Sequence, residues 1–169
     1  HKSGDYIVLK KSINASELIF LDSQYETVIA SAVTTITGTT ADINTVYTAH
    51  AAGTITDLGN EAVTISDTTI AASSLNTLDG NTTGSVNAAS ITTLTGSLAE
   101  IIQAYNSGGI SGLGNEAITL NDITIAVATL NTLNGNTTGV INANTVTTLT
   151  GTAAEITSLF IGPGPGLQG

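Results

Sequence analysis

The sequence predicts an α/β solenoid of about six coils, in which short parallel strands alternate with short helices. Three observations predict it: a long internal repeat, Thr- and Ile-rich stretches of strand length, and capping patterns before short apolar helical faces. Coils of about 27 residues lie within the usual range for such repeats. Because the expected helices are short and rich in Ala and Thr, a right-handed parallel β-helix is the alternative.

The repeat is a run of residues that returns without gaps. Leu-Gly-Asn-Glu-Ala at residues 58–62 returns at 113–117, an offset of 55 (113 − 58), and Thr-Thr-Leu-Thr-Gly at 92–96 returns at 147–151. A divergent first copy aligns loosely with both, until a short insertion at 48–53 restores the phase. We therefore divide one continuous solenoid into four parts: a divergent N-terminal repeat at 1–57, a second repeat at 58–112, a third at 113–161 and a Gly/Pro tail at 162–169.

The clearer helix of each unit follows the glycine that closes the Thr-rich run. Ser or Thr followed three residues later by an acid is the capping-box pattern, and it predicts the cap pairs Thr39 with Asp42, Ser97 with Glu100, and Thr152 with Glu155. Apolar residues at helical spacing follow each pair: Ile43, Val46 and Tyr47; Ile101, Ile102 and Tyr105; Ile156, Leu159 and Phe160.

A weaker second helix is expected around Ala71, Leu75 and Leu78, with Gly80 as its left-handed cap and Gly135 in the same role in the next copy. β-Branched stretches at 62–66 and 90–95 predict strands, so each unit should contain strand–helix–strand–helix. Thr-x-Thr pairs at 35–37, 93–95 and 148–150 resemble the ladders of ice-binding solenoids. They fall on alternate coils only, so Thr-rich parallel strands are the preferred interpretation.

Composition and charge exclude several classes of function. The formal net charge is −10, and Lys2, Lys10 and Lys11 are the only basic residues besides two histidines. Binding of nucleic acid needs Lys and Arg to neutralise phosphates, so a nucleic-acid partner is excluded. No apolar stretch reaches the roughly 18 residues that cross a bilayer, so membrane insertion is not expected. With only 9% charged residues, the surface must consist of Thr, Ser, Asn and Gly, a composition typical of exported repeat proteins.

No pattern indicates catalysis. His1 and His50 are the only histidines, and neither recurs, so His50 is interpreted as a surface residue rather than the base of a triad. Acids do recur, as Glu61 with Glu116 and as Asp67 with Asp122; the second pair is interpreted as N-caps of the helices that follow. Acids repeated along an array indicate a lattice rather than one site, and the sequence predicts no enzyme and no cofactor.

Calcium is the metal that an acidic repeat protein would bind. The Gly-Gly-x-Gly-x-Asp repeat and the EF-hand loop are absent. Asp79 and Asn81 are weak candidate ligands, because the next copy has Asn134 in place of the carboxylate, and a turn is the preferred interpretation. Asn14, Asn81 and Asn136 begin acceptor triplets for N-glycosylation, which chance also produces in a chain rich in Asn and Thr.

Residues 75–84 (Leu-Asn-Thr-Leu-Asp-Gly-Asn-Thr-Thr-Gly) and 91–96 resemble repeats in very large secreted bacterial proteins, notably cyanobacterial ones. The resemblance covers most of residues 31–158 and, more loosely, 12–30. It implies an extracellular or cell-surface location and an architectural, adhesive or filament-forming role. It implies no catalytic residue.

Two functional hypotheses follow. The leading one is a structural protein that forms an extracellular filament, surface layer or stalk by head-to-tail assembly with copies of itself, because a solenoid leaves open strand edges at uncapped ends. In it, the tyrosines and lysines of the first repeat form a cap or dock on the next subunit. The alternative is an adhesin or binding module for a glycan, a surface or calcium.

Overall fold

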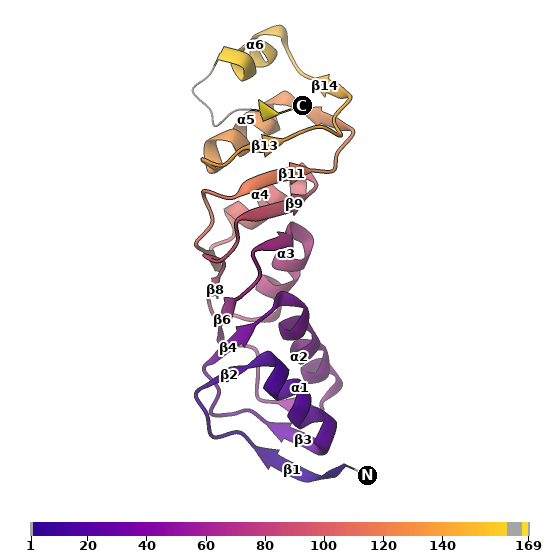
Figure 1. Cartoon of the computed structure of the whole chain (residues 1–169), viewed down its shortest axis with the longest axis vertical. Coiled ribbons are helices and arrows are strands. Elements are labelled where there is room, and N and C mark those ends of the chain that lie inside the picture. Colours follow the sequence, from indigo (N-terminus) through magenta and orange to yellow (C-terminus); the bar gives the residue numbers. More distant parts are fainter. Residues whose placement is uncertain (1, 162–166, 169) are drawn as a thin grey trace. The chain divides into compact units, whose positions relative to one another are not determined.

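The computed structural model describes residues 2–161 and 167–168 and is an α/β fold (Figure 1). Short parallel strands alternate with helices, and within the described residues the strands form four parallel sheets that do not close into a barrel. This alternation favours the α/β expectation over the β-helix. His1 and the predicted tail, apart from 167–168, lie outside the described residues. Within them, every helix is too short or too polar to cross a bilayer.

The chain divides into two compact units. The first comprises His1–Asp67, Thr77–Ser90 and Gly108–Gly112. One of its sheets has the order β1-β3-β5 and the other β10-β8-β6-β4-β2. Its strands are β1 (Ser3–Ile7), β2 (Ser12–Asn14), β3 (Tyr25–Ile29), β4 (Thr35–Gly38), β5 (Ile55–Thr56), β6 (Ala62–Ile65), β8 (Val86–Asn87) and β10 (Ile110–Ser111), and its helices are α1 (Ala15–Gln24) and α2 (Thr40–Ala52).

The second unit comprises Thr68–Asn76, Ile91–Ser107 and Leu113–Gly169. Its larger sheet has the order β15-β13-β11-β9-β7, and β12 pairs with β14 in the smaller one. Helix α3 (Ala72–Asn81) contributes residues to both units. The remaining elements are β7 (Thr69–Ala71), β9 (Thr93–Gly96), α4 (Leu98–Asn106), β11 (Ala117–Leu120), β12 (Thr124–Ala126), α5 (Val127–Asn136), β13 (Ile141–Asn142), β14 (Thr148–Thr150), α6 (Ala153–Ile161) and β15 (Leu167–Gln168).

Each unit buries apolar residues at matching positions of neighbouring strands. In the first unit, the register places Ile36 beside Ile13 and Val63, and in the second it places Leu94 beside Ile70 and Ile118. All of these side chains are buried, and each contributes about 1.5–3 kcal/mol relative to an exposed one. The strand predicted at 62–66 is confirmed by β6, whereas the one predicted at 90–95 begins later, at Thr93.

The elements recur at the spacing of the sequence repeat. β6, β7 and α3 begin at positions 62, 69 and 72, and their counterparts β11, β12 and α5 begin at positions 117, 124 and 127. The repeat at 58–112 contains β6, β7, α3, β8, β9, α4 and β10, so the strand–helix–strand–helix prediction has the two helices but omits three of the five strands. In the divergent first copy, the insertion at 48–53 lengthens the helix: α2 has 13 residues and its counterpart α4 has 9.

The predicted glycine caps of the second helix are wrong. Gly80 lies inside α3 and Gly135 inside α5, and neither has a positive φ. The helix also begins at Ala72, because Ala71 is the last residue of β7. A tertiary contact sets the end of α5 instead: the next residue, Thr137, is extended and buried, and its hydroxyl donates to the carbonyl of Glu116 at 3.0 Å.

Candidate functional site

The residues predicted as caps lie at helix N-termini. Ser97 and Glu100 form a reciprocal capping box on α4, and Thr152 and Glu155 exchange the same hydrogen bonds at α6. On α2 only one half forms, because Thr39 accepts from the amide of Asp42 at 3.1 Å. The Ser97 amide and hydroxyl, which donate to Glu100, lower the pKa of that carboxyl, and the equivalent donors of Thr152 lower the pKa of Glu155.

The second pair of recurring acids caps different helices from those predicted. Asp67 accepts from the amide of Thr40 at 2.7 Å, and Asp122 accepts from the amide of Leu98 at 2.7 Å. Each carboxylate therefore binds the first turn of a helix that lies well before it in the chain, not the helix that follows. Negative charge there is favoured by the unpaired amides and the dipole of the helix.

A buried carboxylate lies at the centre of the first unit's main polar cluster. Glu61 is 1% exposed. Its carboxylate accepts from the Gly59 amide at 2.9 and 3.0 Å and from the Tyr47 hydroxyl, through Oε2, at 3.1 Å. The carbonyl of the same residue accepts from the Thr82 hydroxyl at 2.7 Å. Thr82 Oγ1 in turn accepts from the amide of Gly84 at 3.0 Å, which closes the cluster.

The second unit contains the same cluster. Glu116, which is 0% exposed, accepts from the Gly114 amide at 2.9 Å and from the Tyr105 hydroxyl at 2.7 Å. Burial, with the nearby carboxylate adding to it, raises the pKa of Tyr105; burial likewise raises the pKa of Tyr47. Both phenols therefore remain protonated donors to a carboxylate at neutral pH.

The glycine that ends the Asn-Thr-Thr-Gly motif, Gly84 or Gly139, lies against the backbone of the buried glutamate. A Cβ on Gly84 would overlap the carbonyl of Glu61, and a Cβ on Gly139 would overlap that of Glu116. No side chain fits between these two segments, so the glycine that ends Asn-Thr-Thr-Gly is required for the carboxylate segment to pack against it.

The two buried carboxylates have the same kinds of hydrogen-bond partner. Each carboxylate is bonded to an amide and a phenol, and the residues described there form no nucleophile–base pair.

His50 is half-buried rather than a surface residue, and its Nδ1 lies 3.0 Å from the carbonyl of Ile55, so it links the end of α2 to β5.

No family model, curated protein or solved structure matches the chain. The geometry of the residues is therefore the basis for any functional conclusion.

The two weak calcium candidates, Asp79 and Asn81, lie on one helix. Asp79 lies within α3, and Asn81 ends that helix and donates to Asn44 Oδ1 at 3.2 Å. Among the residues that the structure describes, no group of three or more His, Asp or Glu could hold a metal ion.

The glycosylation candidates differ in access: Asn14 Oδ1 caps α1 at the amide of Ser16, whereas the Nδ2 atom of Asn136 is buried.

The five-stranded sheet of the first unit also presents a row of polar side chains beside its buried row. In the first unit, register partners along β2, β4, β6, β8 and β10 form an outward row of Asn14, Thr37, Thr64, Asn87 and Ser111. All but one of these are exposed and the other is half-buried. The expected Thr pairs are thus continued by Asn and Ser rather than by Thr alone.

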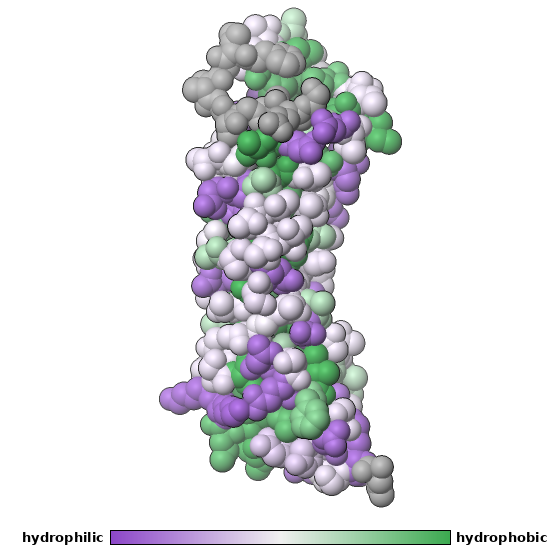
Figure 2. Space-filling model, in the orientation of Figure 1, coloured by the Kyte–Doolittle hydropathy of each residue, from purple (hydrophilic) through white to green (hydrophobic). Residues whose placement is uncertain are grey.

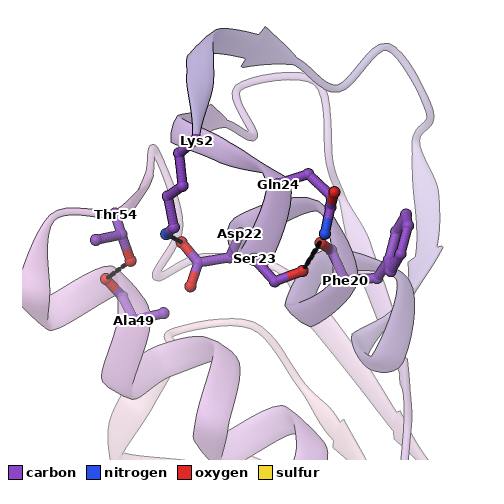
Figure 3. Close-up of polar contacts among 7 residues, drawn as sticks. All are labelled: Lys2, Phe20, Asp22, Ser23, Gln24, Ala49 and Thr54. Carbon is purple, nitrogen blue, oxygen red and sulfur yellow. Dashed lines mark hydrogen bonds and ion pairs between the residues drawn. The ribbon is translucent and has the colours of Figure 1, made fainter.

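Large apolar residues are exposed at the first elements of the first unit. Ile7 and Leu9, in and after β1, are 57% and 83% exposed, and Phe20 on α1 is 62% exposed. The space-filling view shows hydrophobic surface around these elements (Figure 2). Lys2 reaches from the start of β1 to Asp22 on α1, at 3.9 Å, in the same region (Figure 3).

Proposed function

We propose that this chain is a structural repeat protein with solenoid architecture that forms an extracellular filament, surface layer or stalk by head-to-tail assembly. One observation carries the proposal: every strand and helix from β5 to α4 recurs in the next copy of the repeat, and buried residues such as Leu75 and Leu130 recur with them. A repeat of this kind is built by stacking, and stacking can continue from one molecule to the next.

The register of the strands supports the solenoid. In the first unit, Ile13 pairs with Ile36, Ile36 with Val63, and Val63 with Val86. The steps between these partners are 23, 27 and 23 residues (36 − 13, 63 − 36 and 86 − 63), and all of the strands are parallel. Parallel pairing at such regular intervals is the pattern of successive coils, each returning to the same place in the sheet.

The buried clusters and the surface support a structural rather than a catalytic role. Glu61 bonds to Tyr47 on α2 and to Thr82, directly after α3. Glu116 bonds to Tyr105 on α4 and to Thr137, directly after α5. Each buried glutamate therefore cross-links two segments of its unit, which is a structural role. The outward row of Thr, Asn and Ser, together with the net charge of −10, suits a protein that functions outside the cell.

Assembly can be tested on the purified chain. We expect weight-average mass in sedimentation equilibrium to rise with concentration, and negative-stain microscopy to show fibres or layers of uniform width. A chain that remains monomeric at millimolar concentration and forms no fibres would refute the proposal.

The outward polar row favours adhesion to a glycan as the second candidate function. Amide and hydroxyl groups at adjacent strand positions lie about 4.8 Å apart and can bind repeated sugar hydroxyls. A glycan array, read with the wild-type chain and a Thr64→Val/Asn87→Val variant, tests this: binding must be present and must fall with the substitution. A rise in Tm that chelator reverses would identify calcium as the ligand instead.

A further inference from the structure

Two strands lack a neighbour that their counterparts have. β6 lies between β4 and β8, and β11 lies between β9 and β13. β1 is the counterpart of β6, because Tyr6 pairs with Val28 of β3 as Val63 pairs with Val86 of β8. Within the described residues, β1 pairs with β3 alone, and β14, the counterpart of β9, pairs with β12 alone.

The missing neighbours are complementary. β14 lacks a strand of the β6/β11 type, and β1 lacks a strand of the β4/β9 type. β1 is itself a strand of the type that β14 lacks, and β14 is a strand of the type that β1 lacks. The internal pairs β4–β6 and β9–β11 therefore give the register in which β14 and β1 would pair.

Side-chain exposure marks the same two places. Leu94 of β9 is 0% exposed, and its counterpart Leu149 of β14 is 36% exposed. Val63 of β6 is 1% exposed, and its counterpart Tyr6 of β1 is 37% exposed. The internal register pairs Ile36 with Val63 and Leu94 with Ile118, so it would place Leu149 opposite Tyr6 and bury both.

The backbone hydrogen bonds between the internal strands predict which groups would bond at the β14–β1 contact. The amides of Ala62 and Ala117 donate to the carbonyls of Thr34 and Thr92, at 3.0 and 2.9 Å, and the corresponding positions are Asp5 and Thr147. Directly after β1, the amide of Val8 donates to the carbonyl of Ile29 of β3. Because alternate residues of a strand bond to opposite sides, the amide of Asp5 is directed to the free edge.

Among the described residues, the last strand, β15, does not lie beside β14. β15 pairs with β13 through Ile141 and Leu167, much as β10 pairs with β8 through Val86 and Ile110. It therefore takes the place of a β10-type strand and not that of a β11-type strand.

We propose that β14 of one copy pairs in parallel with β1 of a second copy, giving the strand order β12-β14-β1-β3 across the junction. This contact rests on the proposed function and names the surfaces that assemble. Residues 2–11 contain three lysines and one acid, Asp5, and two of the lysines are ion-paired within the chain, with Asp22 and Glu17. The segment 26–155 contains acids without a lysine or arginine, so Lys11 is the lysine left to meet an acidic partner surface.

The junction differs from the internal contacts at one position. The place of Asp67 and Asp122 is taken in the first copy by Lys10, which is ion-paired with Glu17 on α1. The carboxylate cap on the neighbouring helix is therefore absent at the junction, and a lysine is opposite in charge to Glu155 in the first turn of α6. The junction is weaker than the internal contacts and sensitive to salt.

Disulfide trapping tests the contact, since the chain has no cysteine. Ile7 and Thr150 become register partners, by analogy with the Thr64–Thr37 and Thr119–Thr95 pairs. The Cα atoms of such partners lie about 4.8 Å apart, within the range of a disulfide. Under mild oxidation, a mixture of Ile7→Cys and Thr150→Cys chains should give covalent heterodimers. A mixture of Ile7→Cys with Thr119→Cys, whose side chain is exposed but not at an edge, should give at least about tenfold less.

A backbone variant provides an independent measurement. Asp5→Pro removes the amide directed to the free edge and leaves the β1–β3 hydrogen bonds intact, so the critical concentration for assembly should rise about tenfold or more. Asp5→Ala retains the amide and is the matched control. Fibres that form without the Ile7–Thr150 disulfide, and equally well with Asp5→Pro, would overturn this contact and leave the proposed function standing. A chain that does not assemble at all would overturn both.

Discussion

At the scale of single residues, the glycines of the repeat have different physical causes. Gly84 is required because another backbone segment lies where its Cβ would be, whereas the space around a Cβ on Gly80 is open. Both belong to the same Gly-Asn-Thr-Thr-Gly run, so the sequence pattern does not distinguish them.

This difference predicts opposite effects of the same substitution. Gly80→Ala should stabilise the protein by about 0.5–1 kcal/mol, because Gly80 is helical and alanine has the higher helix propensity. Gly84→Ala should destabilise it by about 2 kcal/mol or more, because Glu61 must move away from the added methyl group. Urea unfolding of the two variants measures both, and equal effects would contradict the close approach at Gly84.

The tyrosine–carboxylate pairs predict a dependence on alkaline pH. Because burial raises the pKa of Tyr47, the unfolded chain loses the phenol proton near pH 10 while the folded chain keeps it. The unfolded state then binds fewer protons, so stability is fully present below about pH 10 and falls as pH rises further. Tyr47→Phe should reduce this fall.

At neutral pH, Tyr47→Phe should cost about 1–3 kcal/mol, because buried Glu61 loses a donor. Tyr25→Phe, at a half-buried tyrosine of β3, is the control and should change stability at neutral pH by less than about 0.5 kcal/mol. Thermal melts from pH 7 to 11 give both quantities. An unchanged alkaline slope in Tyr47→Phe would refute the role of its phenol.

At the scale of elements, caps that come from distant segments hold the helices in place. Asp122→Ala should destabilise the chain by about 1–2 kcal/mol, because the Leu98 amide, the first of α4, loses its acceptor. Asp122→Asn keeps an oxygen acceptor and should cost less, since only the charge is lost. If both variants unfold at the wild-type urea concentration, the carboxylate is not a cap.

The caps of α4 show which contacts can be predicted from the sequence and which cannot. The Ser97–Glu100 box could be predicted because both partners lie within one turn of a helix, and the β6 strand because it is a short run rich in β-branched residues. The partner of Asp122 could not, since Leu98 is distant in the chain and any acid before a helix start has a local cap as its simplest interpretation. Tyr47 was predicted only as part of an apolar face, because its periodicity does not reveal the hydroxyl bond to Glu61.

At the scale of the whole molecule, the repeat predicts that one full period can be removed. Deletion of residues 58–112 joins Asp57 to Leu113, so that β5 is followed by β11 where β6 was. Ile118 then lies opposite Ile36, in the place of Val63, and Glu116 replaces Glu61 beside Tyr47. In a solenoid, stability is a sum of repeat and neighbour terms, so the shortened chain should still unfold cooperatively, at a somewhat lower Tm.

Deletion of residues 85–112 is the matched control, because it removes β8, β9, α4 and β10 and half a period rather than a whole one. β11 then follows α3 directly, and Glu116 loses Tyr105 without gaining an equivalent phenol. We expect its Tm to lie about 10 °C or more below that of the 58–112 deletion, since several kcal/mol of matched contacts are lost. Circular dichroism melts of the two chains compare them directly. Equal stability would show that phase does not govern the packing, and the solenoid proposal would then fail together with the head-to-tail junction that depends on it.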